Sequence, residues 1–419
     1  MQKLEVLGGK KLKGRIKISG SKNASLPILA STILSKEKIY LSNIPKVKDI
    51  DTMINLLKFI GSKIIINKKK KSLIIKNNDK LKSSAPYNMV KTMRAGILVL
   101  GPMLARFHKA KVSLPGGCSI GTRPIDIHLN SLSKLGVKYK ILNGYVHAYA
   151  KKGLVGAKIK FPKISVGATE NMIIAATMAK GITILSNCAI EPEIKDLVNF
   201  LNKIGAKIKW VGKRTVKIFG VNKFKSNKYK IMPDRIEAGT YMMAAALTKG
   251  SLIIDGINPK IIKTEIDILK KIGVKIKTFN NQFKVAGSKI IKNINIKTSP
   301  YPGFPTDLQA QIMVLLCRAN SNSRINEEIF ENRFMHCSEL NRMGAKITAK
   351  GNKAYIKGKI NFKSAELMAT DLRASVSLVL AALIAEGKSY INRIYHLDRG
   401  YEEIEMKLRK VGARIKRIS

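Results

Sequence analysis

The segment LLKFIGSKIII (56–66) carries the pattern that decides the fold, because the same pattern returns five more times. In each copy a helix end rich in Leu and Lys is followed by Gly, a small or branched residue and an alternating strand. The other copies are LSKLGVKYKIL (132–142), LNKIGAKIKWV (201–211), LKKIGVKIKTF (269–279), LNRMGAKITAK (340–350) and LRKVGARIKRI (408–418). Their glycines are separated by 75, 69, 68, 71 and 68 residues. This regular spacing predicts six repeated units and excludes a chance recurrence of Lys-Ile-Gly.

Each unit also contains an earlier helix that is rich in small apolar residues. The six helices are ASLPILASTIL (24–34), TMRAGILVLGPML (92–104), ENMIIAATMAKG (170–181), EAGTYMMAAALTKG (237–250), LQAQIMVLLCR (308–318) and LRASVSLVLAALIAEG (372–387). A helix that is apolar nearly all round must be buried on every side. The amphipathic helices of the repeat should lie outside these, and each repeat glycine should take the left-handed position after its helix. We therefore predict an α/β fold in which sheets surround buried helices.

Three units per domain is the natural division of the six. The polar segment VNKFKSNKYK (221–230) is typical of a crossover between domains. We predict one domain from residues 22–230, which carries a glycine-rich loop, and a discontinuous catalytic domain from residues 1–21 and 231–419. A cleft between two similar domains is a common place for a small-molecule site.

The chain is strongly basic, with 78 Lys and Arg against 27 Asp and Glu and a net charge of +51. Such a charge can indicate a nucleic-acid or membrane-surface partner. It can also reflect compositional drift toward Lys on solvent-exposed faces. We favour drift, because the lysines spread over the whole chain and no aromatic-basic interleaving accompanies them. A positive field should still attract anionic substrates.

The cysteines and the apolar segments favour a cytoplasmic protein. The four cysteines are scattered, without a CxxC pair or metal-ligand spacing, and are Cys118, Cys188, Cys317 and Cys337. This pattern is typical of reduced thiols and predicts neither disulfides nor a zinc site. The N-terminus lacks an apolar signal segment, and the stretch SVSLVLAALIA (375–385) is too short to span a bilayer. No glycine fingerprint for a dinucleotide or a triphosphate is present, so we expect no cofactor and no metal.

One cysteine lies in the loop LPGGCSIGTRP (114–124), which is rich in Gly and Pro. Such a loop is expected to be exposed and mobile. A thiol near cationic groups can have a lowered pKa and act as an acid or a nucleophile. The alternative is that Cys118 is a small surface residue with no role.

Charged residues at helix starts suggest a site for anions. Lys22 and Asn23 precede a buried helix, where an anion would also meet the positive end of the helix dipole, although Lys22 could be an ordinary surface lysine. Arg94 falls inside an apolar helix and would need a fixed anion. Asp307 opens a helix, where it could be a cap or a general base, and the cap is the favoured reading. Further charged residues in similar positions are Arg333, Asp371, Arg373, Asp398 and Arg399. Together these residues indicate a cofactor-free transferase that acts on polyanionic substrates.

Ten motifs, in order along the whole chain, resemble those of the enolpyruvyl transferase family, in the branch that uses UDP-N-acetylglucosamine. They are SKNASLPILA, VKTMRAGI, LPGGCSIGTRPIDIHL, SVGATENM, EPEIKDL, PDRIEAGTY, FPTDLQAQ, FENRFMH, TDLRAS and IYHLDRGYEEIE. The resemblance implies an inside-out α/β barrel of two domains, each with three repeated units.

The resemblance also implies a reaction. The enolpyruvyl group of phosphoenolpyruvate is transferred to the 3′-hydroxyl of UDP-N-acetylglucosamine through a tetrahedral ketal, and phosphate is released, in the first committed step of peptidoglycan precursor synthesis. The partners would then be these two substrates, with no specific nucleic acid and no membrane, and we expect a monomer. The nearest alternative is 5-enolpyruvylshikimate-3-phosphate synthase, which lacks the cysteine loop. A basic nucleic-acid-binding protein is a further alternative, supported only by the charge.

Roles carry over from the family motif by motif. Cys118 would protonate the methylene carbon, could form an adduct with phosphoenolpyruvate, and would be the thiol that fosfomycin alkylates. Asp307 would deprotonate the attacking hydroxyl, which reverses the preference for a cap. The implied phosphoenolpyruvate contacts are Lys22, Asn23, Arg123, Arg373 and Arg399, with Arg333 nearby, and Lys22 and Arg399 also count as catalytic. The implied nucleotide-sugar contacts are Arg94, Arg123, Pro124, Ile125, Asp126, Ile127, Lys163, Ile164, Ser165, Val166, Asp307 and Ile329. Asp371 and Asp49 would support these groups from behind.

Overall fold

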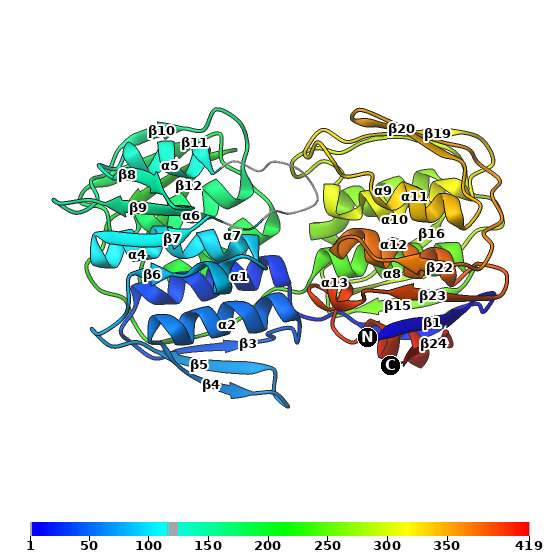
Figure 1. The fold of residues 1–419 in the computed structure, drawn as a ribbon, viewed down its shortest axis with the longest axis horizontal. Helices are drawn as coiled ribbons and strands as arrows, with labels where there is room; N and C mark the ends of the chain where they lie inside the picture. The colour runs from blue at the N-terminus through cyan, green and yellow to red at the C-terminus, as the bar shows by residue number, and fades with distance from the viewer. Residues whose placement is uncertain (1, 115, 117–124, 419) are drawn as a thin grey trace. The chain divides into compact units, whose positions relative to one another are not determined.

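A computed structural model describes residues 2–114, 116 and 125–418 (Figure 1). Cys118, Arg123 and Pro124 therefore lie outside the described residues. The chain forms two compact units. Among the described residues, unit 1 combines those up to Ser19 with those from Pro233 onward, and unit 2 contains those between Gly20 and Met232.

Six four-stranded sheets share one topology, in which a short strand pairs in parallel with a second strand and two antiparallel pairings follow. In spatial order, the sheets of unit 2 are β14 (Asn227–Lys230), β3 (Ile39–Ser42), β5 (Ser72–Lys76), β4 (Lys63–Asn67); β6 (Ser84–Ala85), β7 (Lys109–Ser113), β9 (Tyr145–Tyr149), β8 (Lys138–Leu142); and β10 (Lys158–Lys160), β11 (Ile182–Ser186), β13 (Thr215–Phe219), β12 (Lys207–Gly212). Those of unit 1 are β2 (Lys13–Lys17), β15 (Ser251–Asp255), β17 (Gln282–Ala286), β16 (Lys275–Thr278); β18 (Asn295–Lys297), β19 (Ser323–Asn326), β21 (Lys353–Ile356), β20 (Ile347–Lys350); and β22 (Glu366–Met368), β23 (Lys388–Asn392), β1 (Lys3–Leu7), β24 (Arg414–Ile418).

The sixth sheet is completed by the N-terminal strand. β1 pairs antiparallel with both β23 and β24. In each of the other five sheets, this place beside the edge strand is taken by the strand that comes next along the chain after the edge strand. The segment 221–230, expected to be a polar crossover, instead contains β14, which pairs in parallel with β3 inside unit 2. Among the described residues, the chain passes from one unit to the other after Ser19 and after Met232.

The helices predicted to be buried occupy the middle of each unit, with the sheets around them (Figure 1). They are α1 (Lys22–Ser31), α4 (Leu100–Phe107) and α6 (Val166–Ala176) in unit 2, and α8 (Arg235–Leu247), α10 (Gln309–Cys317) and α12 (Leu372–Ala382) in unit 1. All thirteen residues of α8 are buried. The helices α8, α10 and α12 contact one another, and α6 contacts both α1 and α4. The prediction that sheets surround buried helices is confirmed.

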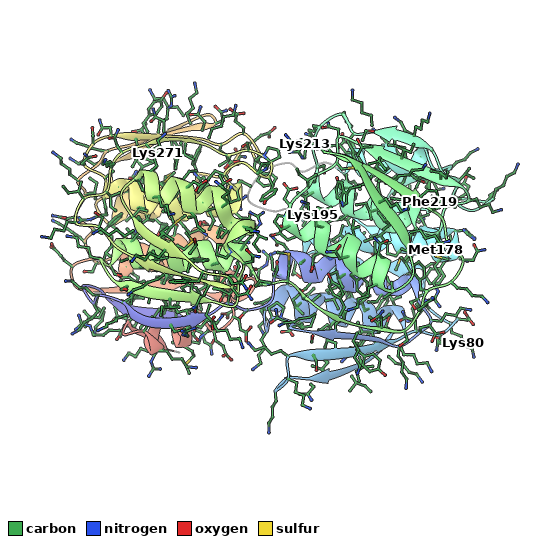
Figure 2. All side chains as sticks on the ribbon, turned by 180° about the vertical axis from the view of Figure 1, so that it is seen from behind. Lys80, Met178, Lys195, Lys213, Phe219 and Lys271 are labelled. Atoms are coloured by element: carbon green, nitrogen blue, oxygen red, sulfur yellow. The ribbon has the colours of Figure 1, made fainter. Side chains whose placement is uncertain are left out.

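Six amphipathic helices complete the repeats, each in contact with the strand that follows it. They are α2 (Lys48–Ile60), α5 (Asp126–Ser133), α7 (Pro192–Lys203), α9 (Lys263–Lys271), α11 (His336–Arg342) and α14 (Ile404–Lys410). On α7, for example, Leu197 and Leu201 are buried while Lys195, labelled in Figure 2, is exposed. Short helical segments are η1 (Thr32–Leu34), α3 (Tyr87–Val90), η2 (Arg94–Val99), η3 (Pro259–Ile262), η4 (Thr306–Leu308) and α13 (Tyr395–Asp398).

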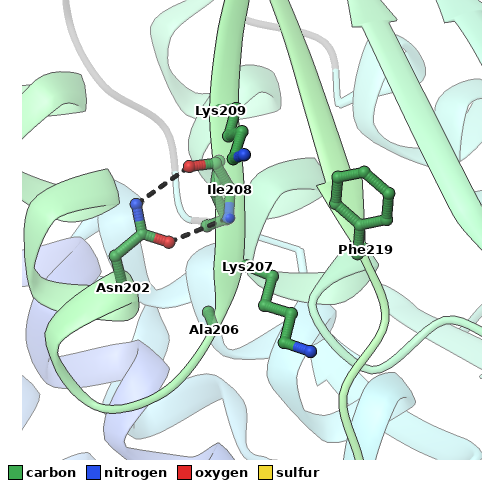
Figure 3. Close-up of a pocket in the computed structure, with 6 residues that line it drawn as sticks. All are labelled: Asn202, Ala206, Lys207, Ile208, Lys209 and Phe219. Carbon is green, nitrogen blue, oxygen red and sulfur yellow. Dashed lines mark hydrogen bonds between the residues drawn. The ribbon is translucent and has the colours of Figure 1, made fainter.

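The return from each amphipathic helix to its strand depends on the repeat glycine. All six glycines have positive φ, from 90° at Gly344 to 116° at Gly61, as predicted for the position after the helix. In two repeats an asparagine reinforces this turn. The Asn202 amide donates to the Ile208 carbonyl at 2.9 Å and accepts from its N–H at 2.8 Å (Figure 3), and Asn341 forms the same pair of bonds with Ile347.

The hollow drawn in Figure 3 lies beside this turn. It is lined by Asn202, Ala206, Lys207, Ile208, Lys209 and Phe219. Its amide already bonds the backbone of β12, and its other polar side chains are two lysines. The hollow therefore reflects the repeat's turn, and it contains none of the site residues predicted from the sequence.

Replacement of Gly136 by Ala should lower the free energy of unfolding by about 1 kcal/mol, because φ is 91° there and a Cβ disfavours that conformation. No atom lies within 4 Å of the Cβ that would be added, so the cost is backbone strain alone. Urea unfolding of Gly136→Ala should show the lower midpoint. Gly212→Ala, also in unit 2, is the control, since Gly212 is not in the positive-φ region and the nearest atom to an added Cβ is 3.5 Å away. Equal midpoints for the two variants would contradict this account.

Candidate active site

The carboxylate of Asp307 lies between two guanidinium groups in unit 1. Arg333 Nη2 donates to Oδ1 at 2.7 Å, and Arg373 Nη2 donates to Oδ2 at 2.8 Å. Both arginine side chains are 5% exposed, whereas that of Asp307 is 25% exposed. Charge-assisted contacts of this kind are the strong ones in proteins. The partly exposed carboxylate of Asp307 is therefore held by two buried guanidinium groups.

The expectation from the residues alone, that Asp307 caps a helix, is wrong. Asp307 lies inside η4, and neither η4 nor α10 has a side-chain cap bond at its start. The carboxylate instead faces Arg333 and Arg373, which come from segments 26 and 66 residues away. No local pattern around Asp307 could have indicated these partners.

A second layer of polar contacts holds Arg333. Its Nη1 donates to Thr306 Oγ1 at 2.8 Å, and that hydroxyl donates to Glu327 Oε2 at 2.8 Å. The other oxygen of Glu327 accepts the backbone N–H of Ile329 at 2.9 Å. The N–H of Ile329 is thus engaged by Glu327, so a backbone contact from Ile329 to a ligand would come from its carbonyl.

Arg373 is positioned by the start of α12. Asp371 is the N-cap of this helix, and its Oδ1 accepts the N–H of Arg373 at 2.8 Å. Burial lowers the pKa of the Arg373 guanidinium, but the Asp307 carboxylate outweighs this and raises the pKa above its ordinary value. Arg373 therefore stays charged although it is buried.

Two histidines lie close to this group. Burial lowers the pKa of His336 to about 4, with Asp371 opposing the change and Arg333 adding to it. Burial and then the charge of Arg399 lower the pKa of His396, whereas the charge of Asp371 opposes this change. Arg399 is half-buried and directly follows α13. These interactions bring Asp307, Arg333, Arg373, Asp371 and Arg399 to one region of unit 1, while Asp398 forms a bidentate pair with Arg417 and has a structural role.

In unit 2, Lys22 and Asn23 are the first two residues of α1, and Ser21 caps this helix by accepting the N–H of Ala24 at 3.2 Å. Lys22 Nζ lies 3.2 Å from Asp49 Oδ2, and the two side chains are 11% and 6% exposed. Asp49 therefore supports Lys22 as the resemblance implies. An ammonium group at the start of a buried helix is a favourable place for an anion.

Arg94 is half-buried and is the first residue of the 3₁₀ segment η2, which leads directly into α4, so it lies at the start of a helical segment and not in the interior of a helix. Its segment is joined to two other predicted parts of the site by Asn171 of α6. The Asn171 amide donates to Ile97 O of η2 and contacts His128 Nδ1 of α5, both at 3.1 Å. The Oδ1 of Asn171 accepts the N–H of Gly101 at 2.7 Å, so His128 Nδ1 must act as the acceptor and Nε2 carries the hydrogen.

The other described residues of segments 125–127 and 163–166, which were predicted to contact the nucleotide, lie at helix starts. Ile125 directly precedes α5, which Asp126 and Ile127 open. Ser165 caps α6 by accepting the N–H of Ala168 at 3.3 Å, Val166 is the first helical residue, and Lys163 and Ile164 come just before. Burial and then Arg94 lower the pKa of His128 to about 4, with Asp126 opposing. Arg94, Asp126 and His128 therefore lie within electrostatic reach of one another.

Several polar residues around these sites were not predicted from the sequence. His128 and Asn171 in unit 2, and Thr240, Gln311 and Tyr401 in unit 1, all fall inside the quoted motifs. Their spacing carries no signal, since each is a single polar residue in or beside an apolar helix. The three described cysteines are buried, and burial raises the pKa of the Cys188, Cys317 and Cys337 thiols to about 12, which leaves them unreactive.

The comparison with known families is decisive. The profile of the family EPSP synthase (3-phosphoshikimate 1-carboxyvinyltransferase) matches residues 6–408. The chain belongs to this family. Among the relatives of this EPSP synthase family member, a protein of Pelagibacter ubique (strain HTCC1062) is 72% identical over 419 residues, which cover 100% of both chains. One of Endomicrobium trichonymphae is 50% identical over 416 residues, which cover 99% of both. Both relatives are named UDP-N-acetylglucosamine 1-carboxyvinyltransferase.

Solved structures agree with the family assignment at the level of the fold. The enolpyruvyl transferase NikO from Streptomyces tendae matches with a TM-score of 0.90 and 21% identity, covering 99% of this chain and 98% of that one. EPSP synthase from Acinetobacter baumannii matches with a TM-score of 0.77 and 18% identity, and each chain is covered completely. The predicted fold class is confirmed by these similarities.

Two further observations concern residues 2–114, 116 and 125–418. No helix there combines the length and the apolar character needed to cross a membrane. Nor do three or more His, Cys, Asp or Glu side chains in this part of the chain come together in a way that could hold a metal ion.

The neutral His128 predicts a dependence of stability on pH. Its folded-state pKa of about 4 lies below the ordinary 6.5, so the unfolded chain binds the proton first as the pH falls. The free energy of unfolding should therefore decrease between about pH 6.5 and pH 4, by about 3 kcal/mol for a shift of this size. Urea unfolding at pH 7 and pH 4.5 should show a smaller difference for His128→Gln than for the unaltered protein. An identical pH dependence in both proteins would contradict the neutral, buried state of this histidine.

Proposed function

We propose that this protein transfers the enolpyruvyl group of phosphoenolpyruvate to the 3′-hydroxyl of UDP-N-acetylglucosamine and releases phosphate. The observation that carries the proposal is the 72% identity, over all 419 residues, to a protein named for this reaction. The polar residues gathered in the two units support it, since both substrates are anions and the candidate site is rich in Arg and Lys. The family name also covers 3-phosphoshikimate as acceptor, and this is the alternative that the first experiment must test.

The reaction proceeds by addition and elimination. The 3′-oxygen forms a bond to C2 of phosphoenolpyruvate and loses its proton, while C3 gains a proton, which gives a tetrahedral ketal. The ketal then loses the proton from C3 and breaks the C2–O bond to phosphate. The double bond is restored, and the balance is one enolpyruvyl ether and one inorganic phosphate.

Asp307 accepts the proton of the 3′-hydroxyl in this proposal. The Asp307 carboxylate is more exposed than the two arginine side chains that contact it. A carboxylate can accept about four hydrogen bonds, so the contacts from Arg333 and Arg373 leave it able to accept more. The two guanidinium groups fix its direction, which is what a general base requires. They also offer further N–H donors to an anionic substrate next to the carboxylate.

The phosphate and carboxylate of phosphoenolpyruvate are assigned to Lys22, Asn23, Arg123, Arg373 and Arg399. Lys22, held by Asp49, and Arg373, held by Asp307, are cations whose positions are fixed by carboxylates. Preorganised cations stabilise the charge that develops on the leaving phosphate at no reorganisation cost during the reaction. Cys118, outside the described residues, is assigned the proton transfer to C3, and with it the adduct with phosphoenolpyruvate and the reaction with fosfomycin.

The nucleotide sugar is assigned to Arg94, to residues 123–127 and 163–166, to Asp307 and to Ile329. Helix starts at α5 and α6 present backbone N–H groups and a positive dipole end, which suits a diphosphate. The residues assigned to each substrate are drawn from the two domains predicted above, 22–230 and 1–21 with 231–419. We place the reaction in the cytoplasm, where the scattered cysteines stay reduced, and expect a monomer with no partner beyond its substrates.

The first experiment is to mix the protein with phosphoenolpyruvate and UDP-N-acetylglucosamine and to follow phosphate release. We expect release with this acceptor, and its loss when fosfomycin adds once to Cys118, as judged by mass spectrometry. Release with shikimate 3-phosphate alone would overturn the choice of acceptor. Absence of release with either acceptor would contradict enolpyruvyl transfer and would direct attention to salt-dependent binding of nucleic acid.

Removal of the proposed base or acid should separate binding from turnover. Asp307→Asn should lower kcat by about 10²- to 10⁴-fold, because the amide cannot take the proton, while the Kd for UDP-N-acetylglucosamine measured by calorimetry stays similar. Cys118→Ser should lower turnover in the same assay.

Asp255→Asn is the matched control for Asp307→Asn. Asp255 also lies in unit 1, pairs with Arg15 at 3.4 Å and is 31% exposed, and its variant should keep full activity. Full activity of Asp307→Asn would show that another group accepts the proton.

A further inference from the structure

Tyr401, two residues beyond Arg399, is buried in unit 1 at 2% exposure. Its hydroxyl lies within hydrogen-bond distance of three side chains from three buried helices. These are Thr240 Oγ1 of α8 at 2.9 Å, Gln311 Nε2 of α10 at 3.2 Å and Arg373 Nη1 of α12 at 3.4 Å. One phenolic oxygen therefore joins the three central helices of this unit.

The direction of each bond follows from the chemistry of the groups. The Thr240 hydroxyl donates to Ile236 O at 2.9 Å, so its oxygen accepts the hydrogen of Tyr401. Gln311 Nε2 and Arg373 Nη1 are donors and point their hydrogens at the Tyr401 oxygen. Burial raises the pKa of Tyr401, although Arg373 and Thr240 oppose this, so the hydroxyl keeps its hydrogen. The oxygen thus acts as an acceptor toward Arg373.

The same groups close a ring around Asp307. Gln311 Nε2 donates to the backbone carbonyl of Asp307 at 3.0 Å as well as to Tyr401. Arg373 uses Nη1 for Tyr401 and Nη2 for Asp307 Oδ2, at 3.4 Å and 2.8 Å. Both the main chain and the carboxylate of Asp307 are therefore connected to one hydroxyl, each through a single side chain.

The aromatic ring adds a second contact to the same guanidinium. Arg373 Cζ lies 5.6 Å from the centroid of the Tyr401 ring, within the range of a cation–π interaction. Arg333, the other arginine that contacts Asp307, is held by different groups. Its Nη1 donates to Thr306 Oγ1 at 2.8 Å, and its Cζ lies 5.1 Å from the centroid of the Phe330 ring. Tyr401 thus contacts Arg373, whereas Arg333 is held by other groups.

We infer that Tyr401 is a positioning residue, which fixes the guanidinium of Arg373 and, through Gln311, the main chain of Asp307. Its consequence for catalysis rests on the proposed function, in which Arg373 binds phosphoenolpyruvate and Asp307 receives the proton. Tyr401 touches no reacting atom in this scheme. Its hydroxyl fixes the orientation of the Arg373 guanidinium group.

The chain offers a matched control in Tyr241, which follows Thr240 in α8. Tyr241 is also fully buried in unit 1, and its hydroxyl has no hydrogen-bond partner among the described residues. Tyr241→Phe therefore removes a hydroxyl of the same kind from the same core without touching Arg373. Loss of an unpartnered buried hydroxyl is expected to be neutral or slightly stabilising.

The first test compares the two variants in the phosphate-release assay. Tyr401→Phe keeps the ring and should lower kcat/KM for phosphoenolpyruvate by about ten- to thirty-fold, the loss expected for one hydrogen bond to a charged group. The KM for the nucleotide sugar should change less than about two-fold. Tyr401 bonds directly to Arg373, which is assigned to the other substrate, whereas it reaches the main chain of Asp307 only through Gln311, and the Asp307 carboxylate keeps its contact with Arg333. Tyr241→Phe should leave both quantities unchanged. Equal effects of the two substitutions, or an equal change for both substrates, would overturn the inference.

The second test requires no activity and so separates this inference from the proposed function. Thermal unfolding is measured for Tyr401→Phe combined with Arg373→Lys, and combined with Arg333→Lys. The combination with Arg373→Lys should lower the midpoint by at least about 2 °C less than the sum of the single changes, because Lys no longer presents the donor that Tyr401 accepts. The combination with Arg333→Lys should be additive. Additive shifts in both combinations would overturn the inference, whereas an inactive parent protein with the expected coupling would overturn only the proposed function.

Discussion

A helix that is apolar on all sides must be covered on all sides, and six such helices impose this constraint on the whole chain. Each unit meets it with three buried helices, three four-stranded sheets and the amphipathic helices of the repeat. Small residues such as those of α8 (Arg235–Leu247) allow these helices to approach closely. Polar side chains are then confined largely to helix ends, or to interior positions where partners satisfy them. This is why candidate site residues in each unit lie at helix starts, as Lys22 and Ser165 do in unit 2 and Asp371 does in unit 1.

Much of the fold could be predicted because the repeat is local. The helix, glycine and strand follow one another within about eleven residues, and each glycine reports its own left-handed turn. What could not be predicted depends on distant pairing. Strand β1 (Lys3–Leu7) completes the sheet of β23 and β24, almost 400 residues away, and β14 joins β3 although its polar sequence reads as a linker. Strand pairing over such distances leaves no periodic trace in either segment.

The candidate site residues also divide into those predictable from local sequence and those that depend on distant contacts. Lys22 and Asp371 could be placed at helix starts, because capping residues and buried helices are visible in the sequence. The cap prediction for Asp307 was wrong because its partners Arg333 and Arg373 lie 26 and 66 residues further along the chain. Roles for residues such as Ile329 and Lys163 came from family resemblance and not from residue chemistry. A polar residue inside an apolar helix is visible in the sequence, but its partner is not.

The excess of positive charge is spread over all six repeats. Exposed basic residues occur on the edge strand of every sheet, in both units: Lys63, Lys138, Lys207, Lys275, Lys350 and Lys416. Lysines on other elements, such as Lys80, Lys213 and Lys271, are also exposed (Figure 2). A nucleic-acid site would concentrate such residues on one surface of a unit, whereas here each repeat carries its own share. The buried cations differ in kind, because Lys22 and Arg373 are each fixed by a carboxylate. Surface lysines can attract an anionic substrate, and only the fixed cations can orient it.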